Sequence, residues 1–404
     1  MDLSLSENQE MLKKTAREFI EKEYPWQKVR DIQQSPQAFQ PETWKQLNDL
    51  GWLGLPFPET QGGAGGDFMD TVVLLEEIGR GLLPSPFQST VAVCGPAILQ
   101  FGSDAQKKAF LPAIAAGQRI LAFALTEADA KYEASSIDTT AKRDGANYVL
   151  DGTKMFVRDG NIADHLLVIA RTDPHPSGSA RGPLPQTGEG KTGDRRSPLQ
   201  GTAGEMSGLT AFLVDAKSPG IMTTLLRTAA MDRQSEIVFN NVKVPAANIL
   251  GKPGQGWDVA EWTMKRAILA ECAELVGAMQ KVLETTIQYA KDRVQFGRPI
   301  GSFQGLQFKV ADMVTDTDGA RFITYYAVWK LLEGQPCDDD IARAKVWVSE
   351  ASRRVVREGH QIHGGIGFIT EHFLHLYTRR CKSGELIYGS ADSHRKAVAA
   401  ALLD

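Results

Sequence analysis

The sequence predicts an α+β protein in which a helical module, a β module and a second helical module follow one another. Residues 1–118 show the apolar spacing of helices. Residues 119–245 contain short runs of β-branched and aromatic residues, and residues 246–404 return to long helical patterns. At 404 residues the chain is also too long for one simple core. We therefore expect three domains with these boundaries.

The first module is expected to open with an amphipathic helix. Ser4 or Ser6 stands as a candidate N-cap ahead of Glu7 and Glu10, and apolar residues then recur at helical spacing. A second helix, "PETWKQLNDLGWLGLP", is closed by Gly51, and the glycine-rich "PETQGGAGGD" follows as a loop. The helical period then returns in "FMDTVVLLEEIGRGL", "STVAVCGPAILQFG" and "SDAQKKAFLPAIAAG".

The middle module is expected to be a sheet. Six short runs carry the residues that strands favour: "RILAFALTE", "ANYVLDGTKMFVRDG", "HLLVIART", "LTAFLVDA", "IMTTLLRT" and "SEIVFNNVKV". Between the third and fourth runs, residues 173–208 are heavy in Pro, Gly, Ser and Thr. This composition is typical of a mobile excursion between two strands.

The last module is expected to consist of long helices. The patterns are "WDVAEWTMKRAILAECAELVGAMQKVLETTIQYAKDRVQF", "FQGLQFKVADMVTDTDGARFITYYAVWKLLEG", "DDDIARAKVWVSEASRRVVREGHQIHG" and the short final "SADSHRKAVAAALLD".

Composition argues against several classes of protein. A net charge of −4 produces no global positive field for nucleic acid or an anionic membrane. No apolar run approaches the roughly 20 residues that span a bilayer, and no signal peptide is expected at the N-terminus. The four cysteines lack CxxC spacing, as is typical of free thiols in a reducing, cytoplasmic setting. Two histidine pairs at i,i+3 spacing have no third ligand cluster, so we expect no metal: His360/His363 and His372/His375.

Several motifs occur in order along the chain. They are "MDLSLSENQEML", "GLPFPETQGGAGGD", "FALTE", "DGTKMFV", "RVQFGRPIGSFQGLQ" from Arg293, and "QIHGGIGFITE" from Gln361. With these motifs nearly the whole chain resembles the flavin-dependent acyl-CoA dehydrogenase family. The resemblance implies an N-terminal helical domain, a middle β-barrel-like domain and a C-terminal four-helix bundle.

The last two motifs carry groups suited to FAD, a long dianionic dinucleotide with a flat redox-active ring. Arg293 supplies a fixed fork for phosphate, Phe296 a ring for adenine, and Gln304 an amide. Gly364 and Gly365 let backbone N–H groups approach an anion closely. Taken alone, the two glycines would read equally well as a helix C-cap, but together with the Arg293 motif they favour phosphate.

The resemblance assigns further roles. Thr126 matches a threonine that hydrogen-bonds the flavin pyrimidine edge, and Phe156 stands where a tryptophan often shields the flavin face. Ser390 and Asp392 fall in a segment that contacts the cofactor. In the family, an FAD held mainly by one subunit is reached by residues of its neighbour, which implies a dimer or homo-tetramer, or a hetero-oligomer. The neighbour's residues would be Arg293, Phe296, Gln304, Gln361, Gly364 and Gly365.

The chain departs from the family pattern in the middle module. A loop that usually continues Pro-Gly-Ala-Gly-Ser-Asp after Thr-Glu reads "TEADAKYEASSID" here, which introduces Lys131, and Arg158 replaces a common threonine. These two cations either meet the phosphates of CoA or an acidic acyl group, or are surface charges. Arg266 is a third candidate for substrate binding.

The expected catalytic base is missing. Dehydrogenation of an acyl thioester removes a Cα proton, usually by a Glu that follows Ile-Tyr and precedes Gly-Thr in the family. Here "ELIYGSADSHR" (385–395) places Tyr388 at that position or deletes the Glu. Lowering the pKa of a tyrosine from about 10 to neutrality would need about 4 kcal/mol. Tyr388 is therefore better read as a proton donor, an orienting hydroxyl or a filler.

Other carboxylates remain as candidates for the base. Some family members place it on the long helix, where this chain has Ala267. Glu271 and Glu274 lie four and seven residues further on the same helix face, and either is the base or both are paired structural charges. Asp392 lies one turn after the gap, and Glu385 lies just before it.

Three hypotheses follow. The first is an FAD-dependent acyl-CoA dehydrogenase with a relocated base, which passes electrons to an electron-transfer flavoprotein. The second is a flavin-bearing paralogue with non-redox acyl-CoA chemistry, such as elimination, desulfination or C–C hydrolysis. The third is a non-catalytic subunit that completes a neighbour's FAD site in a hetero-oligomer. The acyl group is not specified by any of these motifs.

Overall fold

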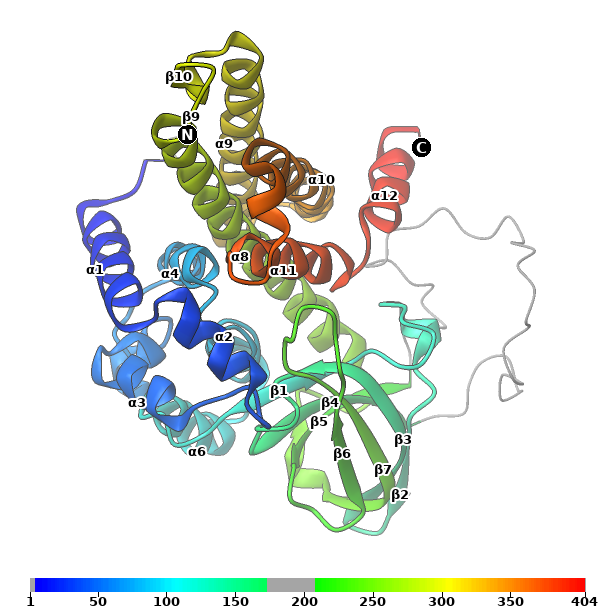
Figure 1. The fold of residues 1–404 in the computed structure, drawn as a ribbon. Coiled ribbons are helices and arrows are strands. Elements are labelled where there is room, and N and C mark those ends of the chain that lie inside the picture. The colour runs from blue at the N-terminus through cyan, green and yellow to red at the C-terminus, as the bar shows by residue number, and fades with distance from the viewer. Residues whose placement is uncertain (1–3, 173–207, 404) are drawn as a thin grey trace.

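The computed structural model describes residues 4–172 and 208–403. It has N-terminal helices, a mixed sheet and a set of long helices in chain order, which confirms the predicted class (Figure 1). Figure 1 shows the sheet below the long helices, with the N-terminal helices beside both. The predicted excursion at 173–208 lies outside the described residues, except for its last residue. The predicted domain boundaries stay predictions; one falls between α6 and β1, the other at the end of β7.

The N-terminal part is built from helices with clear sequence signals. Ser6, rather than Ser4, is the N-cap of the first helix, and it forms a capping box with Gln9. Gly51 adopts the left-handed backbone (φ 73°) that closes the helix predicted before it. The helices are α1 (Glu7–Glu23), α2 (Trp26–Gln34), α3 (Pro41–Asp49), α4 (Phe68–Gly81), the π-helical η3 (Gln88–Cys94), α5 (Gly95–Phe101) and α6 (Asp104–Ala115).

All six predicted strand runs are strands. They form β1 (Leu121–Ala124), β3 (Asn147–Arg158), β4 (His165–Arg171), β5 (Leu209–Asp215), β6 (Ile221–Leu225) and β7 (Gln234–Pro245). The sequence missed β2 (Thr140–Asp144) and β8 (Ile249–Leu250). The "TAKRD" of β2 has little apolar signal because three of its residues are exposed on the hairpin with β3. The order is β6-β7-β3-β2-β4-β5-β8, with β1 parallel to β4.

The C-terminal part contains α8 (Gly256–Asp292), α9 (Gln304–Leu332), α10 (Asp338–His363), α11 (Leu374–Leu386) and α12 (Ala391–Leu403). A short hairpin of β9 (Val294–Gln295) and β10 (Arg298–Pro299) connects α8 to α9. The sequence predicted four of these helices and missed α11. Within the described residues no helix is long and apolar enough to cross a membrane.

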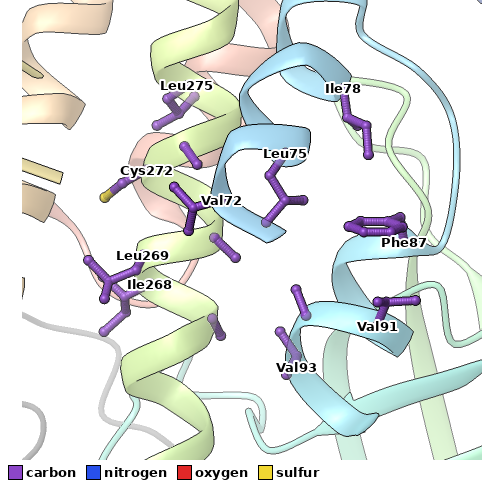
Figure 2. Close-up of a cluster of buried hydrophobic side chains, with 14 of the residues drawn as sticks. Val72, Leu75, Ile78, Phe87, Val91, Val93, Ile268, Leu269, Cys272 and Leu275 are labelled. Atoms are coloured by element: carbon purple, nitrogen blue, oxygen red, sulfur yellow. The ribbon is translucent and has the colours of Figure 1, made fainter. Parts of the chain in front are cut away.

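Helix α8 joins the C-terminal part to the N-terminal part. Figure 2 shows α8 beside α4 and η3, with buried apolar side chains from all three, among them Leu275 of α8, Val72 of α4 and Val91 of η3. The α4 and α8 backbones come into direct contact at two glycines. A Cβ atom on Gly277 would lie 1.8 Å from the Glu76 carbonyl oxygen, and one on Gly79 would lie 2.0 Å from the Glu274 carbonyl oxygen. This close crossing places the middle of α8 beside the sheet.

Candidate functional site

A cavity of about 490 Å³ lies where the sheet meets α11. Its wall is made from four segments: the loop before residue 134, β3, the loop before β7, and the end of α11 with the turn into α12. The lining residues are Ala130, Lys131, Tyr132, Glu133, Phe156, Thr228, Ala229, Ala230, Gln234, Arg379, Lys382, Ser383, Leu386, Ile387, Gly389, Ser390 and Ser393. The volume is that of a small-molecule site.

The backbone around this cavity is strained. Ala130, Phe156 and Tyr388 adopt left-handed backbone angles, with φ of 54°, 56° and 60°. For bulky residues this conformation is uncommon and costs of order 1–3 kcal/mol. At Phe156 it coincides with a bulge in β3, and the ring is 42% exposed on the cavity side. Such strain, gathered at one cavity, indicates a functional site.

Behind the cavity lies a buried cluster of four charges, Arg158, Arg380, Glu271 and Glu274, which we call the arginine–glutamate quartet. Arg158 Nη1 lies 2.8 Å from Glu271 Oε2, and Arg158 Nη2 lies 3.0 Å from Glu274 Oε2. Arg380 Nη1 lies 2.8 Å from Glu271 Oε1, and Arg380 also pairs closely with Glu274. Gln88 Nε2 donates to Glu271 Oε2 at 3.0 Å. The quartet is neutral overall, and each charge faces two of opposite sign.

The arginines of the quartet control the acidity of Glu271. Burial alone would raise the pKa of Glu271, but the Arg380 and Arg158 guanidinium groups outweigh burial and hold that pKa at about 2. Both arginine side chains are largely covered, with 16% and 11% exposed. A carboxylate held this way is a weak base, because a proton must displace two charged hydrogen bonds.

Two tyrosines pack on each other at the first cavity, which Tyr132 lines. The rings of Tyr132 and Tyr388 pack 5.9 Å apart at a tilt of 57°. Burial raises the pKa of Tyr388 well above its ordinary value. Burial also raises the pKa of Tyr132, although the Thr126 side chain and the Tyr388 backbone beside it act in the opposite direction. Both phenols are therefore neutral, which suits a donor or a filler and excludes a phenolate base.

A second cavity, of about 390 Å³, lies on the C-terminal helices. It is lined by Phe296, whose ring is 92% exposed, and by Gln361 together with neighbouring apolar residues. Close by in the chain, Gly364 and Gly365 have no atoms near the position of an added Cβ, so their backbone is open to a ligand. This surface therefore carries an aromatic ring, an amide and accessible backbone, the set expected for a dinucleotide.

Three family models match the chain. They are the acyl-CoA dehydrogenase N-terminal domain over residues 6–118, the middle domain over 122–186 and the C-terminal domain over 254–403. The chain belongs to the acyl-CoA dehydrogenase family. It is 31% identical to an acryloyl-CoA reductase (NADH) of Anaerotignum propionicum, covering 99% of this chain and 95% of that protein.

Two further relatives also match along nearly the full chain. One is the caffeyl-CoA reductase–Etf complex subunit CarC of Acetobacterium woodii, 30% identical over 98% of this chain and 99% of that protein. The other is the structure of butyryl-CoA dehydrogenase from Megasphaera elsdenii, with a TM-score of 0.86, 30% identity and full coverage of both chains. The chain is accordingly an oxidoreductase of the acyl-CoA dehydrogenase type, and flavin is the cofactor of this family.

The residues that the family resemblance predicts to contact FAD lie at two separate cavities. Phe156 and Ser390 line the first cavity, while Phe296 and Gln361 line the second. Thr126 is buried beside Tyr132 and is not part of either lining. Arg293 is the C-cap of α8 and Gln304 is the first residue of α9, and neither lines the second cavity. Their assignment to FAD stays a prediction.

The predicted substrate residues are also divided. Lys131 lines the first cavity. Arg158 is not a surface charge, because the quartet holds it inside the protein. Arg266 lies away from the first cavity, with its guanidinium 3.3 Å over the Trp262 ring, and burial lowers its pKa to about 10. Of these three cations, only Lys131 lines the first cavity.

The candidate bases lie outside the cavity wall. Glu271 and Glu274 belong to the quartet, so they are paired charges, the second of the two alternatives considered for them from the sequence. The Asp392 side chain is 84% exposed and pairs with Arg395 at 2.7 Å. Glu385 pairs with Lys382 at 3.0 Å. The carboxylate that does line the cavity is Glu133, which sequence reasoning missed; its signal was its place in the unusual "TEADAKYEASSID" loop.

The quartet predicts a specific acid sensitivity. Glu271 has a pKa of about 2 in the folded protein against 4.5 ordinarily, so its contribution to stability is complete above pH 4.5 and is lost as pH falls through 2. We expect this carboxylate to contribute on the order of 3 kcal/mol. Urea unfolding at pH 7, 4.5 and 3 measures it. At pH 7 the Glu271→Gln variant should be less stable than the wild type, and it should lose less stability than the wild type as the pH falls to 3. An equal loss of unfolding free energy with pH in the two proteins would contradict the prediction.

Proposed function

We propose that the chain binds FAD and catalyses the α,β-dehydrogenation of an acyl-CoA thioester. The observation that carries the proposal is the cavity of about 490 Å³ beside the strained, exposed ring of Phe156. A flat aromatic face at the wall of a small-molecule cavity suits the flavin ring, and the family membership supports the same chemistry. When bound, FAD supplies the acceptor for the hydride that leaves Cβ.

The chain's own residues fit the two ends of such a complex. Lys131, Arg379 and Lys382 place three cations on the cavity wall, which suits the phosphates of CoA or the pyrophosphate of FAD. The second cavity, with Phe296 and Gln361, suits the adenine end of an FAD held by a neighbouring copy. The proposal therefore includes a dimer or tetramer, because one copy alone holds the two halves of the FAD site apart.

The electron acceptor is the next part of the proposal. A relative is named as a subunit of a reductase–Etf complex, which supports an electron-transfer flavoprotein as the redox partner of this chain. Each carboxylate of the quartet is paired with two arginines, so we place the base of the first cavity on another residue.

The proposal is tested with the purified chain. We expect a yellow protein with an oxidised flavin spectrum, and anaerobic titration with straight-chain, branched and aryl-substituted acyl-CoA thioesters should bleach it with at least one of them. Colourless protein that takes up no added FAD would overturn the proposal. Product formation without bleaching would instead support non-redox chemistry on the thioester.

The quartet also favours a second candidate function. Because Glu271 and Glu274 are neutralised by arginines, the chain fits a subunit that completes the FAD site of a homologous partner without turnover of its own. That function predicts no bleaching by any thioester with the chain alone. Activity would then appear only after co-expression with a homologue that carries its own catalytic glutamate.

A further inference from the structure

Glu133 is the one carboxylate among the described residues that line the first cavity. The other ionic groups of that wall are the cations Lys131, Arg379 and Lys382. We infer that Glu133 is the catalytic base that removes the Cα proton of the acyl-CoA substrate. The inference rests on the proposed function and adds to it the group that the C-terminal motif lacks.

Glu133 is available in a way that the other candidates are not. Across residues 4–172 and 208–403 its carboxylate has no ion-pair partner and accepts no hydrogen bond from another side chain. Glu271, by contrast, gives up two arginine contacts before it can take a proton, and its pKa of about 2 makes it roughly 300-fold weaker as a base than an ordinary glutamate. Asp392 points to solvent. The comparison leaves Glu133.

The backbone that carries Glu133 is fixed. It precedes the short η4 helix (Ala134–Ser136), and the buried Arg171 donates to the Ala134 carbonyl at 3.0 Å and the Ile137 carbonyl at 3.2 Å. On the other side, Tyr132 packs on Tyr388 across the cavity wall. A catalytic base needs a fixed position, and these contacts hold the backbone on both sides of Glu133.

The cavity supplies the rest of what proton removal needs. Glu133 is exposed, so water reaches its carboxylate. A thioester that fills the cavity displaces that water and leaves the carboxylate facing Cα. The Cα–H bond then breaks, the proton goes to Glu133, and the electron pair of that bond enters the thioester carbonyl as an enolate. Return of the proton to Cα restores the thioester, so this exchange needs no oxidant or reductant.

Hydrogen exchange at Cα tests this step by itself. The FAD-loaded protein is reduced with dithionite, which blocks dehydrogenation, and incubated in D₂O with butyryl-CoA or 3-phenylpropionyl-CoA. Mass spectrometry then measures deuterium at Cα. We expect exchange in the wild type, a loss of at least about 100-fold in Glu133→Gln, and partial exchange in Glu133→Asp. The visible spectrum of the bound flavin should be the same in all three.

Asp138 provides the matched control, because it is an exposed carboxylate five residues further along the same loop and lies outside the cavity wall. Asp138→Asn should exchange at the wild-type rate. Undiminished exchange in Glu133→Gln would overturn the inference while bleaching of the wild type by a thioester still supports the proposed function. Exchange that depends on Glu133 without bleaching would remove the redox proposal and keep the base. Wild-type protein that neither exchanges nor bleaches overturns both.

Discussion

Replacing Arg380 with methionine is expected to destabilise the protein by about 3–5 kcal/mol. The substitution leaves Glu271 and Glu274 with only Arg158 between them, so one buried carboxylate loses its counter-charge. Methionine fills much of the same volume, and the loss is therefore one of charge rather than of packing. Denaturant unfolding of the purified variant measures the effect, which should appear as a lower midpoint with an unchanged slope.

Arg379 is the control for this prediction. It is the preceding residue on α11, lines the cavity, and makes no ion pair within the described part of the chain. Arg379→Met should change stability by less than about 0.5 kcal/mol. The double variant Arg380→Met/Glu274→Leu should be more stable than Arg380→Met, because Arg158 and Glu271 then form a neutral pair. Equal losses in the two arginine variants would show that the quartet is not a coupled charge network.

Replacing Gly277 with alanine is expected to cost about 1–3 kcal/mol. The new Cβ would lie 1.8 Å from the Glu76 carbonyl oxygen and 2.6 Å from the Arg80 amide nitrogen, and both are backbone atoms that a side-chain rotation cannot move. Helices α4 and α8 must therefore separate. Since α8 carries two members of the quartet, the separation should also disturb the space behind the cavity.

Gly305→Ala is the control variant for Gly277→Ala. Gly305 lies in the first turn of α9 with no atoms near the position of an added Cβ, so alanine should be neutral or stabilise by up to about 1 kcal/mol through helix propensity. Thermal unfolding of the two variants under the same conditions makes the comparison. A Gly277→Ala protein as stable as Gly305→Ala would refute the close crossing of α4 and α8.

Helices and strands with strong local sequence signals were predicted correctly. Two elements with weak signals were not predicted, and there is a physical reason for each. The strand runs and the capped helix at Ser6 carry periodicity and end signals that need no tertiary contact. β2 and α11 lack a clear apolar pattern: β2 is mostly exposed, and α11 is divided between a buried side and the cavity wall. Both are held by neighbouring elements, since β2 pairs with β3 and α11 packs on α10 and α8.

The class, the order of the modules and the family resemblance follow from the amino-acid sequence, which also singles out three residues that line the first cavity: Lys131, Phe156 and Ser390. Those features depend on composition, periodicity and short motifs, which are local. Which of the described carboxylates are paired with arginines depends on contacts between distant segments, and so on the folded structure. Arg158 and Glu271 are 113 residues apart, and their pairing follows from the meeting of β3 and α8. Glu133 reaches the cavity because a folded loop turns it there, and no local pattern records that direction.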